Sequence, residues 1–378
     1  MTRTRVLVVG AGPVGLLLAG ELARCGVGAV VVDRLASPMT ESRASQLNSR
    51  TAELFAERGL TDLLEAARPE PSGHFGGLRL SVSDVDSPWA GYRKVPQHRT
   101  EAALAGWAVG LGARLLRGHE LCELSDEGDR VVCGLGAADG PVRVVADYVV
   151  GCDGADSTVR RLAGFGHEGA AATRELLRAD VAGIDVPDRR FERFPRGLAI
   201  AATANGVTRV MVHAFGRAPR ERSGPPSFDE VVANWAEVTG EDISAGRPLW
   251  VDAFDNRHGH VTGYRRGRVL LAGDAAHWHM PIGGQALNLG LQDAVNLGWK
   301  LAAEVRGWAP PGLLDSYSEE RHAEGGRVLA NVLTQEQLLL GGPEAEALRT
   351  TFRELMGLDD VRRHLAGVLS GLDVAYGG

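Results

Sequence analysis

A glycine-rich turn near the start of the chain has the spacing of a dinucleotide-binding site. Gly10, Gly12 and Gly15 form the pattern G-x-G-x-x-G, with Pro13 between the last two glycines. The first glycine allows a tight turn, the second lets the backbone approach a diphosphate, and the third lets a helix pack closely on a strand. The free N–H groups at the start of the following helix favour negative charge. This segment therefore predicts a site for a nucleotide diphosphate.

An acidic residue stands where such a site needs one. Asp33 ends an apolar run roughly 20 residues after the glycine pattern, where an acid accepts hydrogen bonds from the adenosine ribose. Its negative charge disfavours a 2′-phosphate. We include the neighbouring Arg34 among the expected cofactor contacts. A glycine-rich turn without a nucleotide is the alternative interpretation, and it leaves the strand, the helix and the acid in register unexplained.

Two further acids each follow an apolar run and adjoin a glycine. Asp153 lies in the stretch 148–160, and Asp274 follows Gly273 at the end of the stretch 268–274. Aspartate beside glycine is common in turns and at helix starts, so both residues can be explained as turn or cap residues. The residues alone leave a cofactor role and a structural role equally open.

These acids and glycines must be positioned by the elements between them. An apolar strand, a helix with an apolar 3.6-residue period and a second apolar strand form a βαβ unit at the N-terminus. The segment 165–264 is richer in prolines and in strand-like runs, and after it a strand and a long helix return to the first domain. The expected helices are 13–24, 101–112, 228–239 and 286–305; the expected strands are 5–9, 27–33, 131–135, 142–150, 198–204, 208–215 and 268–272. We predict an α/β fold with a Rossmann-like domain made of 1–164 and 265–378, C-terminal helices, and an inserted β-rich substrate-binding layer at 165–264.

Composition excludes several classes of protein. The 378 residues are 44% hydrophobic and 24% charged, which is typical of a globular protein, and the formal charge of −7 argues against a nucleic-acid partner. No apolar run approaches the roughly 18 residues of a membrane span. The four cysteines have no disulfide-like or metal-like spacing. We expect a soluble cytoplasmic protein without a membrane partner, acting as a monomer or homodimer.

The motifs together resemble one enzyme family. Beyond the glycine pattern and the two acids, the chain carries Gly-Asp-Ala-Ala-His at 273–277, Pro-Ile-Gly-Gly-Gln-Ala-Leu-Asn at 281–288 and a helical stretch at 293–301. This set resembles the class A FAD-dependent monooxygenases, the para-hydroxybenzoate hydroxylase-like family, over nearly the whole chain. The narrower resemblance is to bacterial hydroxylases of aromatic polyketides.

The resemblance assigns roles to individual residues. It implies that Asp274 binds the flavin ribityl chain, that Asp153 helps hold FAD and the nicotinamide nucleotide, that Arg43 lies near the pyrophosphate and that Gln97 contacts the flavin. The backbone of Pro281, Gly283 and Gly284 is expected to shape the catalytic pocket beside the flavin ring. The complete set of expected cofactor contacts is Gly10, Gly12, Pro13, Gly15, Asp33, Arg34, Arg43, Gln97, Asp153, Gly273, Asp274, Pro281, Gly284, Ala286, Leu287 and Asn288.

The reaction implied by the resemblance is aromatic hydroxylation. FAD is reduced by NADPH or NADH, O₂ is captured as a flavin C4a-hydroperoxide, and a hydroxyl group is transferred to an electron-rich ring. The single glycine pattern leaves no second dinucleotide domain, so the nicotinamide must visit transiently. Baeyer–Villiger insertion, epoxidation and oxidative rearrangement within the same family remain alternatives, as does a catalytically deficient FAD-binding accessory subunit.

The chain departs from the family pattern at three points. Asp33 stands where glutamate is usual, and Ala286 stands where many relatives have glycine. The chain stops near Tyr376, about where polyketide hydroxylases continue, so we expect a thioredoxin-like third domain to be absent.

Candidate substrate and metal residues are less clearly marked. Met211, His213 and Phe215 alternate along one expected strand and are candidates for lining the substrate chamber, although a plain core or solvent face explains the alternation equally well. No cluster of arginines announces a carboxylate in this segment, which favours a neutral polycyclic phenol or quinone. His277 and His279 form a His-x-His pair without a further ligand at suitable spacing, so we expect no metal and assign both to loop packing.

Overall fold

A computed structural model describes residues 2–39, 45–222 and 224–374. Its largest sheet is built around the predicted βαβ unit: β1 (Thr2–Val9), α1 (Pro13–Arg24) and β2 (Ala29–Asp33). The central strand β1 pairs in parallel with β2 and with β11 (Val142–Gly151). Its apolar residues are fully buried because helices and strands cover both faces of a parallel sheet.

The sheet has the order β19-β20-β11-β1-β2-β8, and an antiparallel hairpin extends it. β20 (Val269–Leu271) joins β11 in parallel, so a strand from late in the sequence lies beside the N-terminal unit. Parallel strands present their carboxyl ends at one edge of a sheet, where ligands bind in open α/β folds. The remaining strands of this sheet are β8 (Arg114–Arg117), β9 (His119–Asp126), β10 (Val131–Ala137) and β19 (Arg265–Arg266).

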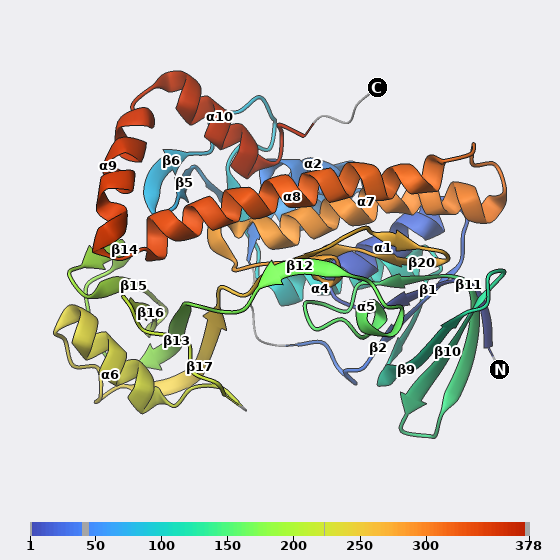
Figure 1. The fold of residues 1–378 in the computed structure, drawn as a ribbon, viewed down its shortest axis with the longest axis horizontal. Coiled ribbons are helices and arrows are strands. Elements are labelled where there is room, and N and C mark those ends of the chain that lie inside the picture. Colours follow the sequence, from blue (N-terminus) through green and yellow to red (C-terminus); the bar gives the residue numbers. More distant parts are fainter. Residues whose placement is uncertain (1, 40–44, 223, 375–378) are drawn as a thin grey trace.

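A second, antiparallel sheet lies apart from the first (Figure 1). Its five strands have the order β14-β15-β16-β13-β17. Helix α6 (Phe228–Thr239) covers one face and buries Trp235 completely against it. The strands are β13 (Glu175–Ala182), β14 (Arg189–Phe194), β15 (Gly197–Ala204), β16 (Val207–Ala214) and β17 (Arg247–Asp255).

Two long helices connect the layers. α7 (Gln285–Arg306) and α8 (Leu313–Leu340) lie side by side along the long axis of the molecule (Figure 1). α7 packs on α1, and α8 reaches the second sheet. Within the described residues, no helix is both long and apolar enough to cross a membrane.

Short elements complete the fold. The other helices are α2 (Ser49–Ala56), α3 (Thr61–Glu65), α4 (Gln97–Gly110), α5 (Thr158–Leu162), α9 (Glu346–Leu355) and α10 (Asp359–Ser370), with single turns η1 (Gly273–Ala275), η2 (Ile282–Gly284) and η3 (Pro343–Ala345). The other strands are β3 (Gln46–Leu47), β4 (Pro69–Glu70), β5 (Ser72–Phe75), β6 (Leu78–Ser81), β7 (Tyr92–Lys94), β12 (His167–Ala170), β18 (His258–Val261) and β21 (His277–Trp278). The predicted α/β class is confirmed, while the proposed domain boundaries stay a prediction.

Candidate active site

The glycine pattern touches the strand end that carries Asp153. Gly10 has φ +107°, and its N–H donates to the carbonyl of Val32 at 2.8 Å. A Cβ atom at Gly10 would lie 2.3 Å from the carbonyl oxygen of Cys152, so only glycine fits this turn. The glycine pattern and the stretch that carries Asp153 are therefore in direct contact.

The stretch that carries Gly273 and Asp274 contacts the start of α1, directly after the glycine pattern. A Cβ atom at Gly273 would lie 3.0 Å from Cγ2 of Val14, in the first turn of α1. A Cβ atom at Gly290 in α7 would lie 2.8 Å from the same Val14 atom and 2.9 Å from Cα of Gly273. Three stretches that are far apart in the sequence thus meet at the carboxyl edge of the main sheet.

Gly12 leaves the start of α1 open. It is the N-cap residue, with φ −75°, and no side chain caps the helix. No atom lies within 4 Å of the position that a Cβ would occupy. The first turn contains no acidic residue and has Pro13 where a missing N–H costs nothing. Uncapped N–H groups facing open space fit a diphosphate.

Asp33 lies beside this turn, and Gln97 lies in a helix that packs on α1. The Asp33 carboxylate accepts hydrogen bonds from the backbone N–H of Ala11 at 2.7 Å and of Leu35 at 2.8 Å. Gln97 begins α4 and donates to Glu101 Oε1 at 2.8 Å. Burial raises the pKa of Glu101 against this hydrogen bond, and the charge of Asp33 adds to the rise. The Asp33 carboxylate is therefore held by the backbone of the glycine turn, while its ribose contact and the flavin contact of Gln97 stay predictions.

Two other predicted cofactor contacts differ in their placement. The Arg34 side chain is exposed beside Asp33. Arg43 lies outside the described residues. Both stay predictions.

Asp153 caps a helix. Its carboxylate accepts from Ser157 Oγ at 2.5 Å and from the N–H groups of Thr158 at 2.7 Å and Val159 at 3.1 Å. Burial raises the pKa of Asp153, and these hydrogen bonds oppose the rise. The structural role that the sequence left open is therefore present at the start of α5, and a cofactor role for this residue stays a prediction.

Asp274 has a contrasting environment. Its side chain is exposed although Gly273 and Ala275 on either side are buried, and no described residue makes a hydrogen bond or ion pair with it. The surrounding protein nevertheless raises the pKa of its carboxyl, with His277 opposing the rise. An exposed carboxylate that no described residue pairs with fits the hydroxyl groups of a ribityl chain.

The loop before α7 provides a second open helix start. Gly283 has φ +70° and Gly284 has φ +66°; Gly284 is the N-cap, and no side chain caps α7. Cβ atoms there would lie 2.9 Å from Nε2 of Gln335 and 2.6 Å from Nε2 of Gln46, so both glycines allow close packing. Pro281 is exposed, and Gly284, Ala286 and Leu287 are half-buried. These four residues are therefore accessible to a ligand, whereas Gly283 is buried.

Comparison with known proteins identifies the ligand that this geometry fits. A profile of the family described as FAD binding domain matches residues 3–332. The chain belongs to the class A FAD-dependent monooxygenase family. The uncapped starts of α1 and α7 and the free carboxylate of Asp274 fit the diphosphate, flavin ring and ribityl chain of FAD.

Three relatives show the range of the family. The 12-dehydrotetracycline 5-monooxygenase/anhydrotetracycline 6-monooxygenase of Streptomyces rimosus subsp. rimosus is 39% identical over 99% of this chain and 77% of its own. The crystal structure of CabE, an aromatic hydroxylase from angucycline biosynthesis, matches with a TM-score of 0.95 and 48% identity over 99% of this chain and 77% of CabE. The dialkyldecalin synthase of Streptomyces rugosporus is 38% identical over 97% of this chain and 80% of its own.

A buried ionic network holds the Asp274 turn, and the sequence did not reveal its role. Asp293 in α7 accepts from the N–H of Gly273 at 2.9 Å, from Nε2 of His277 at 2.7 Å and from Nε of Arg321 at 2.7 Å. These three side chains are at most 1% exposed. Burial would raise the pKa of Asp293, but Arg321 and His277 hold it below its usual value. An acid at a buried position of the predicted helix 286–305 was the available signal.

Asn288 acts on the loop from within the protein. It is buried, and its Nδ2 donates to the carbonyls of Gln46 at 2.9 Å and Gly284 at 2.6 Å. Its Oδ1 accepts from the N–H of Asn48 at 3.0 Å. The side chain therefore positions the loop at 279–284, which we call the flavin-side loop after its predicted role, and the predicted cofactor contact of Asn288 stays a prediction.

The two histidines of the predicted pair make different contacts. His277 belongs to the Asp293 network, and a nitrogen of His279 lies 3.0 Å from the carbonyl of Met280. Burial lowers the pKa of His279 to about 4, so it is neutral at neutral pH. In the part of the chain that the structure describes, no three His, Cys, Asp or Glu side chains are grouped to hold a metal ion.

The three predicted substrate residues lie in different environments. Met211 packs on an apolar cluster that contains Met280 and Ile282 of the flavin-side loop. His213 is buried, with its ring nitrogens 2.8 Å from the carbonyl of Glu175 and 3.2 Å from that of Leu340. The substrate role stays a prediction, and Met211 has the position that suits it.

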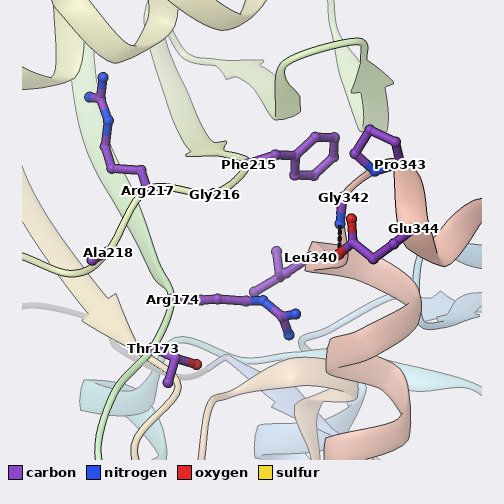
Figure 2. A pocket seen from close by; sticks show the side chains of 10 residues that line it. All are labelled: Thr173, Arg174, Phe215, Gly216, Arg217, Ala218, Leu340, Gly342, Pro343 and Glu344. Atoms are coloured by element: carbon purple, nitrogen blue, oxygen red, sulfur yellow. Dashed lines mark hydrogen bonds between the residues drawn. The ribbon is translucent and has the colours of Figure 1, made fainter.

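Phe215 directly follows the end of β16 and lines a cavity to which neither Met211 nor His213 contributes. This cavity of about 400 Å³ lies between the second sheet and the C-terminal end of α8 (Figure 2). The guanidinium of Arg193 lies 4.7 Å from the centre of the Phe215 ring. The cavity wall also includes Arg174, which is paired with Glu336 at 2.8 Å.

Proposed function

We propose that this FAD-dependent monooxygenase hydroxylates an aromatic polyketide-type substrate, using NADPH or NADH as a transient reductant. One observation carries the proposal: the glycine pattern, the Cys152–Asp153 strand end and the Gly273–Asp274 turn lie in contact, where α1 starts without a side-chain cap and the Asp274 carboxylate is exposed and free. The relative named as a dehydrotetracycline and anhydrotetracycline monooxygenase, and the aromatic hydroxylase CabE from angucycline biosynthesis, support the substrate class. We also propose that the protein works in the cytoplasm as a monomer or homodimer.

The residues of the chain divide the work of placing and shielding the reaction. FAD, when bound, supplies the electron transfer and oxygen chemistry that no side chain provides. Gly12 and the first turn of α1 would hold its diphosphate, and Asp274 would accept hydrogen bonds from its ribityl hydroxyls. The start of α7 would favour negative charge on the flavin ring. Met280 and Ile282 belong to an apolar cluster that would keep water from the ring.

The test is coupled turnover by the holoprotein. Protein reconstituted with FAD should consume NADPH faster when a polycyclic phenol is added, and the product should gain one oxygen that derives from ¹⁸O₂. Protein without FAD is the matched control. Failure to bind FAD, or NADPH consumption that no aromatic compound stimulates, contradicts the proposal.

A second candidate function is supported by one relative. The dialkyldecalin synthase has a name that describes a synthesis rather than an oxygenation, and it is 38% identical to this chain. A ring-forming reaction would proceed in the absence of NADPH and O₂, and its product would have the mass of the substrate. Anaerobic incubation without NADPH therefore separates the two candidates.

A further inference from the structure

One face of the second sheet brings together side chains from four strands. In β13, Arg178 lies opposite Met211 of β16 and Asp252 of β17. Asp180, two residues on, lies opposite Arg209. Directly opposed residues of antiparallel strands point to the same face. Two neighbouring rows cross this face in the strand order β15, β16, β13, β17. The first row is Ile200, Met211, Arg178 and Asp252, and the second row is Ala202, Arg209, Asp180 and Trp250.

This face is turned toward the flavin-side loop. Helix α6 covers the opposite face of the sheet. On the face that carries Arg178, Leu176 and Leu198 pack with Met280 and Ile282. Leu176 precedes Arg178 by two residues on β13, a rise of about 7 Å. The row of Arg178 is therefore the next one outward from the contact with the loop.

Only part of the Arg178 guanidinium has a hydrogen-bond acceptor. Its side chain is only 9% exposed, and Nη2 donates to Asp252 Oδ2 at 3.1 Å. Among the described residues, neither Nε nor Nη1 has a hydrogen-bond acceptor, and Nε is buried. The rings of Trp250 and Phe254 flank the guanidinium at 4.2 Å and 5.6 Å. A buried donor without an acceptor is costly, and a ligand that brings an acceptor to this guanidinium would lower that cost.

The neighbouring arginine makes a clear contrast. Arg209 gives Nε and Nη2 to the two carboxylate oxygens of Asp180, both at 2.7 Å, and it is 43% exposed. The charges of Arg178 and Arg209 are balanced by Asp252 and Asp180. The rows thus offer a directed N–H donor without net positive charge, which suits a neutral oxygen better than a carboxylate.

We propose that Arg178 determines substrate specificity by donating a hydrogen bond to a keto or quinone oxygen of a polycyclic aromatic substrate. The rings of that substrate lie against Met211, Trp250 and Phe254, between this face and the flavin-side loop. The inference rests on the proposed function and adds to it the acceptor group that the substrate must carry. The sequence did not reveal this arrangement because its members lie on separate strands.

The experiment compares two matched probes on the holoprotein with oxidised FAD and no NADPH. 5-Hydroxy-1-tetralone carries a carbonyl group, and 5-hydroxytetralin differs only in lacking it. Binding is measured from the change in flavin absorbance for wild type, Arg178→Met and Arg209→Met. Arg209→Met is the matched control because it removes an arginine of the same face whose Nε and Nη2 are already paired with Asp180.

The expected result is specific to one variant and one probe. Arg178→Met should weaken tetralone binding by about 10- to 100-fold, the value of a hydrogen bond from a charged donor, and leave hydroxytetralin binding unchanged. Arg209→Met should change neither. Equal losses for both probes, or no loss for the tetralone, overturn the inference, as does tighter wild-type binding of 5-hydroxytetralin-1-carboxylate than of the tetralone. A holoprotein that binds FAD but none of the probes contradicts it too, whereas failure to bind FAD contradicts the proposed function itself.

Discussion

Replacing Gly12 by alanine should separate cofactor binding from folding. The backbone of Gly12 is extended, which any residue adopts, and no atom lies within 4 Å of the new Cβ position. Alanine at a helix N-cap costs about 0.5–1 kcal/mol relative to good caps, while the stiffer unfolded chain returns about 0.4–1 kcal/mol. The two effects nearly cancel, so the free energy of unfolding of the FAD-free protein should change by less than about 1 kcal/mol.

The same methyl group occupies the space in which we place the diphosphate. Loss of one charge-assisted hydrogen bond from the start of α1 costs about 1.5–3 kcal/mol, or roughly a 10- to 150-fold higher Kd for FAD. Gly10→Ala is the informative comparison, because its Cβ would lie 2.3 Å from the Cys152 carbonyl oxygen at φ +107°. That variant should lose stability as well as FAD binding.

Urea unfolding of the FAD-free proteins and titration of FAD by fluorescence quenching measure the two quantities. A Gly12→Ala protein that binds FAD within about twofold of wild type would refute the placement of the diphosphate. A Gly12→Ala protein as unstable as Gly10→Ala would refute the claim that Gly12 faces open space.

Three further predictions concern the acids and histidines around the site. Asp274→Ala should raise the Kd for FAD by about 2- to 13-fold, the value of one ordinary hydrogen bond, without loss of stability, and unchanged FAD affinity in the titration would contradict its role. Arg321→Met leaves the Asp293 carboxylate buried without its main partner, so urea unfolding should show a loss of about 3–5 kcal/mol, and a loss below about 1 kcal/mol would show that the network is not structural. Burial and the nearby His322 lower the pKa of His260 to about 4, so the unfolded chain binds this proton at higher pH than the folded protein does. Stability should therefore fall as the pH drops from about 6.5 toward about 4, and His260 should not affect the pH dependence of stability above that window. Urea midpoints at pH 7 and pH 5 measure this fall, which His260→Gln should reduce. An identical pH profile for the variant would contradict the prediction.

The parts of the fold that follow from local sequence patterns were predictable. The βαβ unit and the glycine pattern depend on apolar periods and on glycines at fixed spacing, and α6 was predicted with the bounds that the structure shows. Strands β13 and β17 were not predicted. β13 carries Arg178 and Asp180 among its apolar residues, because one face packs on α6 and the other looks toward the flavin-side loop.

The parts of the site that depend on distant residues were not predictable. Asp293 and Arg321 pair between two helices, and nothing in the spacing of either residue assigns it a partner. The sequence left Asp153 open between a helix cap and a cofactor contact, and the hydrogen bonds that it accepts from the start of α5 depend on the three-dimensional fold. The cluster around Arg178 depends on the register of the second sheet, which alternation along single strands does not specify.

A crystal structure of the protein with FAD tests the central claim most directly. We predict electron density for one FAD whose diphosphate lies at the N–H groups after Gly12, whose ribityl hydroxyls reach the Asp274 carboxylate, and whose ring lies beside residues 281–284. Density for FAD at any other place, or side chains filling the space between these three stretches so that FAD cannot enter, would contradict the account.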